Sequence, residues 1–128
     1  MMSGRILIKR ARVIDPCSGV DEISDVLIVG NLIEAVSKDI AFPDVPGTTV
    51  ISAEGLIVCP GFVDLHAHLR EPGFEYKETI NTGTKAAIKG GFTSVCAMPN
   101  TEPSIDTASM IEFVKMKASS EGMCRVHP

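Results

Sequence analysis

The stretch PGFVDLHAHLREPG, residues 60–73, decides the fold of this chain. It begins with a Pro-Gly turn signal and a short apolar run, and it then places Asp64, His66, His68 and Arg70 at every second position. In a β-strand, side chains two residues apart point to the same face. Two neutral imidazoles on one face can hold a metal ion, and a guanidinium beside them can hold an anion. The spacing therefore predicts a metal site with a clamp for an anionic substrate.

Each of these residues also has a plainer interpretation. The two histidines could be satisfied structural residues, but their position after a strand and before an Arg favours metal binding. A metal held there would lower the pKa of a bound water, which favours hydrolysis of an amide or an ester. Asp64 could bind the metal, orient an imidazole from behind or serve backbone donors, and we expect one of the last two roles. Arg70 could form an ordinary ion pair with Glu71 or Glu75, but its planar fork favours a substrate carboxylate.

Residues 59–128 alternate between strand-like and helical patterns. Apolar residues at helical spacing predict one helix from about residue 77 to 89 and a second from an N-cap at Asp106 to Gly122. Apolar runs predict strands before, between and after these helices, at residues 62–69, 93–98 and 123–126. The order β-α-β-α-β implies a parallel sheet. Lysines in or next to the helices, Lys117 among them, are interpreted as solvated.

The parallel sheet also predicts where a ligand would bind. Ligands of such sheets bind at the carboxyl ends of the strands, in the loops that follow them. His66, His68 and Arg70 fall at the end of the first strand and Asn100 falls just past the second, so the two loops should converge on one pocket. Taken alone, Asn100 is equally well explained as a turn residue. His127 falls at the start of the third strand, away from that end, and is interpreted as structural.

Residues 1–58 consist of short β-branched runs separated by turn residues, which predicts a small antiparallel sheet. A tight hairpin is expected across Gly30-Asn31. This part shows no candidate chemistry of its own. Its carboxylates are interpreted as turn and surface residues, namely Asp15, Asp21, Asp25 and Asp39.

Length and composition limit the classes of function that the chain could have. The 128 residues are fewer than the roughly 250 of a complete α/β barrel. A net charge of -4 argues against a nucleic-acid binder and favours a small-molecule partner. No apolar run approaches the roughly 18 residues of a membrane span, and there is no signal-peptide pattern, so we expect a cytoplasmic protein. The cysteines lack metal-binding spacing and are interpreted as structural thiols, with Cys59 and Cys96 in apolar runs.

The stretch at 60–73 is followed by Glu78-Thr79, Gly90-Gly91-Phe92-Thr93 and Met98-Pro99-Asn100-Thr101. Together these motifs closely resemble the dihydroorotases of the amidohydrolase superfamily, and the similarity covers essentially the whole chain. Hydantoinases and allantoinases share the His-x-His and the Gly-Gly-x-Thr turn but usually lack this combination of Arg70 with Asn100. The resemblance implies an α/β protein. Residues 1–58 would be an N-terminal β-sandwich segment, and residues 59–128 the first two βα units and the start of the third strand of a (β/α)8 TIM barrel.

The resemblance also implies an activity. Dihydroorotases are zinc enzymes, with one or two ions, that reversibly hydrolyse dihydroorotate to N-carbamoyl-L-aspartate in pyrimidine biosynthesis. His66 and His68 would ligate zinc, and Arg70 and Asn100 would hold the substrate carboxylate. The catalytic aspartate and the family's other metal ligands have no matching position in this sequence and are expected beyond its last residue. The chain therefore resembles the N-terminal piece of a dihydroorotase, with an incomplete barrel and no activity alone.

Two other hypotheses about this chain stay open. The chain could be a non-catalytic dihydroorotase-like remnant or interaction module, because two ligands and an open sheet edge make a weak metal site. It could also belong to another cyclic amidohydrolase, a hydantoinase or an allantoinase. For the full-length protein, a homo-oligomer or an association with other pyrimidine-pathway enzymes is left open.

Overall fold

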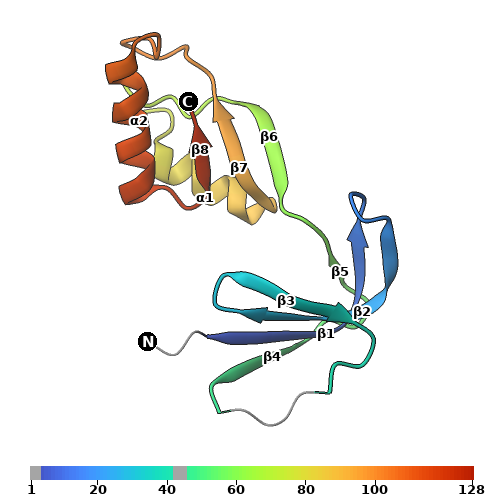
Figure 1. Ribbon diagram of the computed structural model, residues 1–128. Coiled ribbons are helices and arrows are strands. Elements are labelled where there is room, and N and C mark those ends of the chain that lie inside the picture. The colour runs from blue at the N-terminus through green and yellow to red at the C-terminus, as the bar shows by residue number, and fades with distance from the viewer. Residues whose placement is uncertain (1–3, 42–45) are drawn as a thin grey trace. The chain divides into compact units, whose positions relative to one another are not determined.

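Residues 4–41 and 46–128 are described by the computed structural model, and the chain falls into two units, Met1–Pro60 and Gly61–Pro128. The first unit is built from strands alone, and the second alternates strands with helices (Figure 1). Each unit buries its own cluster of apolar side chains. The residues that the sequence singles out for chemistry all belong to the second unit.

The first unit is a five-stranded sheet of β1 (Arg5–Asp15), β2 (Val20–Val29), β3 (Leu32–Ser37), β4 (Thr48–Ser52) and β5 (Ile57–Val58). The expected hairpin between β2 and β3 is present, and it turns at Gly30, whose φ is 63°. β4 and β5 both pair with β1 in parallel. The expectation of a wholly antiparallel sheet is therefore wrong, because β4 and β5 pair with the edge of β1 that β2 leaves free, and both run in the direction of β1.

The long strand β1 has a bulge at Arg10, where its register with β2 slips and φ is 57°. The Asp25 carboxylate supports the bulge by accepting the backbone N–H groups of Arg10 at 2.8 Å and Ile40 at 3.0 Å. Lys9 Nζ lies 3.2 Å from this carboxylate, whose side chain is only 2% exposed. Asp25 is thus a buried structural carboxylate, and its interpretation as a surface residue is wrong.

The second unit is a parallel sheet of β6 (Phe62–Ala67), β7 (Phe92–Ala97) and β8 (Arg125–His127), in that order. Helix α1 (Ile80–Lys89) joins β6 to β7, and α2 (Ala108–Glu121) joins β7 to β8 (Figure 1). These elements confirm the predicted β-α-β-α-β order and the parallel pairing. In the described part of the chain, no helix is long and apolar enough to cross a membrane.

Both helices begin at threonine caps, later than expected from the sequence. The Thr79 side chain accepts the N–H of Thr82, and the Thr82 side chain accepts the N–H of Thr79. This reciprocal capping box satisfies two donors at the start of α1, so the helix begins there. Thr107, and not the expected Asp106, caps α2 by accepting the N–H of Met110.

The core of the second unit lies between the sheet and the two helices. Ile80 of α1 and Val114 of α2 are fully buried and belong to one cluster with Val95 and Ala97 of β7. Val95 and Ala97 are two residues apart on a strand, so their side chains share a face. Both helices therefore cover the same face of the sheet.

On the opposite face of this sheet, the edge strand β6 leaves a large apolar side chain exposed. Val63 of β6 lies level with Ser94, one residue before Val95, and so it points away from the helices. Its exposed fraction is 55%, and that of Leu65 is 73%. Two neighbouring large apolar side chains on one exposed strand mark a surface suited to being covered.

Candidate functional site

Strand β6 positions the candidate site but ends earlier than expected. Its last residue is Ala67, so His68 and Arg70 belong to the segment after the strand. From Asp64 to Ala67, three steps along β6 match two steps along β7, which makes a bulge. Strict alternation fails at a bulge. The prediction that all four polar side chains share one strand face is therefore wrong.

Asp64 supports this bulge. Its Oδ1 accepts the backbone N–H of His66 at 3.0 Å, so the carboxylate serves the backbone and not an imidazole. The ring centroids of His66 and His68 are 5.1 Å apart, in an edge-to-face arrangement. All three residues line a cavity of about 340 Å³ together with residues of α1. The irregular strand end thus brings the two imidazoles together even though the regular alternation is lost.

Asn100 reaches His68 from the loop after β7. Its Oδ1 lies 3.0 Å from Nδ1 of His68. In the tautomer with a proton on Nδ1, His68 donates this hydrogen bond and keeps a lone pair free on Nε2. The expected convergence of the two loops is thus present for His68 and Asn100, and Asn100 has a contact that a simple turn residue would not need.

The loops after β6 and β7 also interlock through their backbones. The N–H of Glu102 donates to the carbonyl of Pro72 at 3.1 Å. Gly73 has a φ of 95° and lies directly against Glu102, where a Cβ would overlap the carbonyl. Only glycine combines this φ with so close an approach. The loop that carries Arg70 is therefore tied to the loop that carries Asn100.

Arg70 sits between two buried neighbours in an uncommon backbone conformation. Its φ is 64°, and the N–H of Glu71 donates to the carbonyl of Leu69 at 2.8 Å. This closes a three-residue turn centred on Arg70, and a positive φ at that centre is rare and strained for an L-residue. Leu69 and Glu71 are each 5% exposed, whereas Arg70 is partly exposed.

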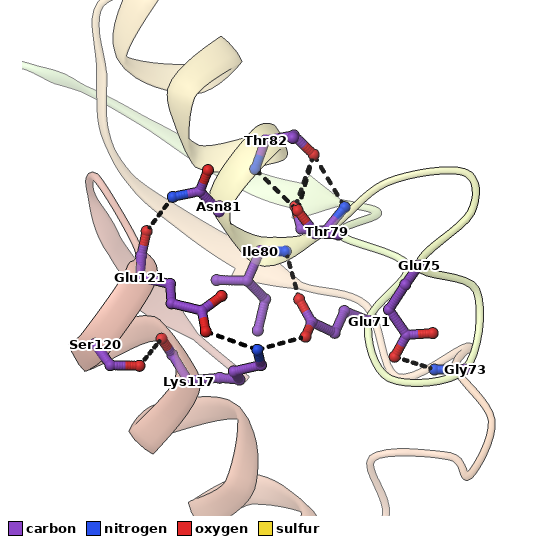
Figure 2. Close-up of polar contacts among 10 residues, drawn as sticks. All are labelled: Glu71, Gly73, Glu75, Thr79, Ile80, Asn81, Thr82, Lys117, Ser120 and Glu121. Carbon is purple, nitrogen blue, oxygen red and sulfur yellow. Dashed lines mark hydrogen bonds and ion pairs between the residues drawn. The ribbon is translucent and has the colours of Figure 1, made fainter.

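The Glu71 carboxylate bonds to the two helices (Figure 2). Its Oε2 accepts the N–H of Ile80, the first residue of α1, at 2.8 Å, and its Oε1 lies 3.3 Å from Nζ of Lys117 on α2. Glu75 accepts a backbone N–H of its own loop at 2.9 Å. The plainer interpretation of Arg70, an ion pair with one of these carboxylates, is therefore wrong.

Sequence reasoning missed the role of Lys117, which it took as solvated. The side chain is 31% exposed and binds two carboxylates. Hydrogen bonds to Glu121 and Glu71 raise its pKa above the ordinary value. The available signal was its position three residues after Val114, which places it beside the buried stripe of α2.

His127 does not lie where the sequence placed it. It is the last residue of β8 and is level with Cys96, one residue before the end of β7. The argument that set it aside, a position far from the carboxyl ends, is therefore wrong. It is exposed and lines a separate cavity of about 750 Å³ beside α2.

The four cysteines are free thiols, and they differ in exposure. Cys17 and Cys59 are exposed, so the apolar run around Cys59 does not bury its thiol. Cys96 and Cys124 are partly buried. Burial raises the pKa of the Cys124 thiol, which makes it a weak nucleophile at neutral pH.

His66 and His68 fit two ligand positions of a metal site. Catalytic zinc is bound by three protein ligands, of which neutral imidazole is a common one. Across residues 4–41 and 46–128, no group of three or more His, Cys, Asp or Glu side chains is placed to hold a metal. The contact of Asn100 with His68 is of the kind that orients a metal-binding imidazole from behind. The two imidazoles could supply two ligands of a metal site, and a complete set would need further donors.

Comparison with known proteins identifies the family. A family model described as dihydro-orotase-like matches residues 55–128. The chain belongs to the dihydro-orotase-like family. This dihydro-orotase-like chain is 48% identical over 123 residues to a dihydroorotase of Trichlorobacter lovleyi, a match that covers 96% of the chain and 28% of the relative. It is 43% identical to a dihydroorotase of Aquifex aeolicus, with 97% of the chain and 29% of the relative covered.

Solved structures support the same grouping. The dihydro-orotase-like chain matches an L-hydantoinase (dihydropyrimidinase) of Arthrobacter aurescens with a TM-score of 0.83 and 25% identity, over 98% of the chain and 27% of that protein. It matches a D-hydantoinase (dihydropyrimidinase) of Thermus sp. with a TM-score of 0.76 and 31% identity, over 94% and 26%. The expected α/β class and the resemblance to dihydroorotases are confirmed. The chain spans little more than a quarter of the length of the relatives it matches.

Proposed function

We propose that the full-length protein is a dihydroorotase, which reversibly hydrolyses dihydroorotate to N-carbamoyl-L-aspartate with zinc as its metal. One observation carries the proposal: the imidazoles of His66 and His68 meet at the end of β6, and Asn100 joins them 3.0 Å from His68. The relatives of Trichlorobacter lovleyi and Aquifex aeolicus, both named dihydroorotase, support it. Because the chain spans 28% of the first of these, the proposal concerns the whole protein.

The metal ligands in this proposal are His66 and His68. Zinc bound there would polarise the scissile carbonyl and lower the pKa of a water molecule. Asp64 holds the bulge that presents the two rings. Transfer of the proton to the leaving nitrogen and the remaining metal ligands are assigned to residues outside this chain, and the number of zinc ions, one or two, depends on those ligands.

Arg70 and Asn100 bind the substrate carboxylate in this proposal. The planar guanidinium of Arg70 can donate two parallel hydrogen bonds to a carboxylate. Asn100 can serve two partners at once, because its Oδ1 faces His68 and its NH₂ group still has two donors for the substrate. Holding the carboxylate would anchor the ring in the site, and such binding lowers KM without changing kcat.

We also propose that residues 59–128 are the first two βα units and the start of the third strand of a (β/α)8 barrel. Residues 1–58 would be part of a β-sandwich. The parallel order β6-β7-β8 supports this, as do the two helices on one face of the sheet. The exposed Val63 and Leu65 fit as well, because the inner face of such a barrel is filled only when later strands close it.

A second candidate is a hydantoinase, favoured by the structural match to the L-hydantoinase of Arthrobacter aurescens. Both candidates hydrolyse a cyclic amide, but hydantoin lacks the ring carboxylate of dihydroorotate. A carboxylate clamp at Arg70 and Asn100 has a purpose only for dihydroorotate. Loss of Arg70 should therefore weaken substrate binding if the protein is a dihydroorotase, but not if it is a hydantoinase.

The test is an assay of the purified, zinc-loaded full-length protein on dihydroorotate, hydantoin and allantoin. We expect dihydroorotate to be preferred, with activity lost on chelation and restored by zinc. Arg70→Met should raise KM for dihydroorotate and leave kcat nearly unchanged, whereas Arg125→Met, at an exposed position of β8, serves as the matched control. A preference for hydantoin or allantoin would contradict the proposal, and an unchanged KM in Arg70→Met would remove the clamp.

A further inference from the structure

The turn at Arg70 is held on both sides by buried residues. Arg70 has a φ of 64°, and its neighbours Leu69 and Glu71 are each 5% exposed. An L-residue keeps a positive φ only where the surrounding structure over-determines it. Leu69 is anchored by the apolar core between the sheet and the helices. On the other side of the turn, the anchor is the buried carboxylate of Glu71.

Glu71 fixes the turn to the start of α1. Its Oε2 accepts the N–H of Ile80 at 2.8 Å (Figure 2). The first N–H groups of a helix have no partner within the helix, and the helix dipole favours a negative charge beside them. Ile80 itself is completely buried. The carboxylate therefore holds the residue after Arg70 against a rigid point of the core.

Lys117 holds the same carboxylate from α2. Its Nζ lies 3.3 Å from Oε1 of Glu71 and 2.8 Å from Oε1 of Glu121. The backbone carbonyl of Glu121 accepts a hydrogen bond from Nδ2 of Asn81 at 2.7 Å (Figure 2). The last turn of α2 is thus bound both to the first turn of α1 and to the residue that follows Arg70.

We infer that Glu71 is the positioning residue for Arg70. It sets the backbone from which the guanidinium reaches the substrate carboxylate, and it does not touch the substrate itself. The inference rests on the proposed function. A group that binds substrate in the ground state loses part of its binding energy when it is displaced, and that loss raises KM. A buried carboxylate adjacent in sequence to the clamp is well placed to prevent such a shift.

The first test is Glu71→Gln in the zinc-loaded full-length protein. The amide keeps an acceptor for the N–H of Ile80 but loses the charge that Lys117 pairs with. We expect KM for dihydroorotate to rise about tenfold, as for the loss of one charge-assisted hydrogen bond, with kcat unchanged. The inhibition constant of 5,6-dihydrouracil, which has the same ring without the carboxylate, should stay the same.

A second variant, Lys117→Met, leaves the bond between Glu71 and Ile80 in place. It should raise KM for dihydroorotate in the same direction but less, and it carries the test if Glu71→Gln does not fold. The matched controls are Lys115→Met and Glu112→Gln, which remove an exposed ion pair of 2.9 Å from the same helix. Neither control should change KM.

Two results would overturn the positioning role. One is an unchanged KM for dihydroorotate in both Glu71→Gln and Lys117→Met. The other is an equal loss of affinity for dihydroorotate and 5,6-dihydrouracil, which would mean general damage to the site. A wild-type protein that does not hydrolyse dihydroorotate would instead overturn the proposed function, and the positioning role with it.

Discussion

Nδ1 of His68 and Oδ1 of Asn100 lie 3.0 Å apart, although the two residues are separated by 32 positions in the chain. The parallel pairing of β6 with β7 brings the loops after both strands to the same edge. This one contact can fix both the tautomer of His68 and the orientation of the Asn100 amide. It favours the His68 tautomer with a free Nε2, and it turns the Asn100 amide so that its NH₂ group is available to a ligand.

Two replacements of Asn100 should separate its roles. Asn100→Asp keeps an oxygen for His68 but places a negative charge beside the substrate carboxylate. We expect this variant to retain zinc and to bind dihydroorotate poorly. Asn100→Ala removes both contacts, so zinc affinity should fall roughly tenfold to a hundredfold, as when other partners of metal-binding residues are lost. Zinc affinity by competition with a chelator and KM for dihydroorotate measure the two effects, and equal zinc affinity in both variants would contradict the orienting role.

Replacement of either histidine should remove metal from the full-length protein. His66→Ala and His68→Ala each delete one imidazole of the pair whose ring centroids are 5.1 Å apart. Loss of one ligand from a catalytic zinc site leaves too few donors to hold the ion. Metal content after dialysis, measured by mass spectrometry, should fall well below that of the wild type. His127→Ala is the control and should retain its metal; if it loses zinc as the other two do, the site has been placed wrongly.

Gly73→Ala should loosen the two loops of the site. The positive φ of Gly73 alone costs an alanine about 1–2 kcal/mol, and the overlap of its Cβ with Glu102 should add about 1–3 kcal/mol. Gly55→Ala is the matched control, because Gly55 has a φ of 79° but an added Cβ meets nothing within 4 Å. Hydrogen exchange of the Glu102 amide, which donates to Pro72, should speed up in Gly73→Ala only. Equal effects of the two substitutions would rule out the close loop packing.

Asp25 should make stability depend on pH in the acid range. Burial acts to raise its pKa, but the hydrogen bonds from Arg10, Lys9 and Ile40 outweigh burial and lower the pKa. A lowered pKa stabilises the folded state above the unfolded value of about 3.9, and this contribution is lost as pH falls through the folded pKa. Asp25→Asn should therefore lower the unfolding free energy by about 1–3 kcal/mol at neutral pH and flatten its decline in acid.

The measurement for Asp25 is urea unfolding between neutral and acid pH, together with hydrogen exchange of the Arg10 and Ile40 amides. Asp21→Asn is the control, because Asp21 pairs with Arg12 on the surface, where both side chains are about half exposed. Exposed ion pairs contribute little to stability. If the curves of Asp25→Asn and the wild type run parallel down to acid pH, the carboxylate does not carry the expected linkage.

The order of strands and helices around the site could be predicted, because each element shows a pattern within its own stretch of sequence. The apolar spacing of residues 108–121 and the glycines that end the helices are read within a few residues. The predicted helix boundaries were less accurate. The apolar pattern starts near residue 77, but α1 begins at Ile80 because the Thr79 side chain caps the helix there. In the first unit, the parallel pairing of β4 with β1 escaped prediction because pairing partners are chosen by non-local packing.

The sequence by itself determined which chemical groups the proposed site would contain: His66, His68, Arg70 and Asn100, within motifs that also indicate the family. Only the tertiary structure decided how those groups are held. The bulge at Asp64, the contact of His68 with Asn100 and the burial of Glu71 between two helices join residues that no local pattern connects. The reason is physical: a spacing fixes the groups that a chain carries, whereas their orientation depends on which distant donors and acceptors become neighbours when the core packs.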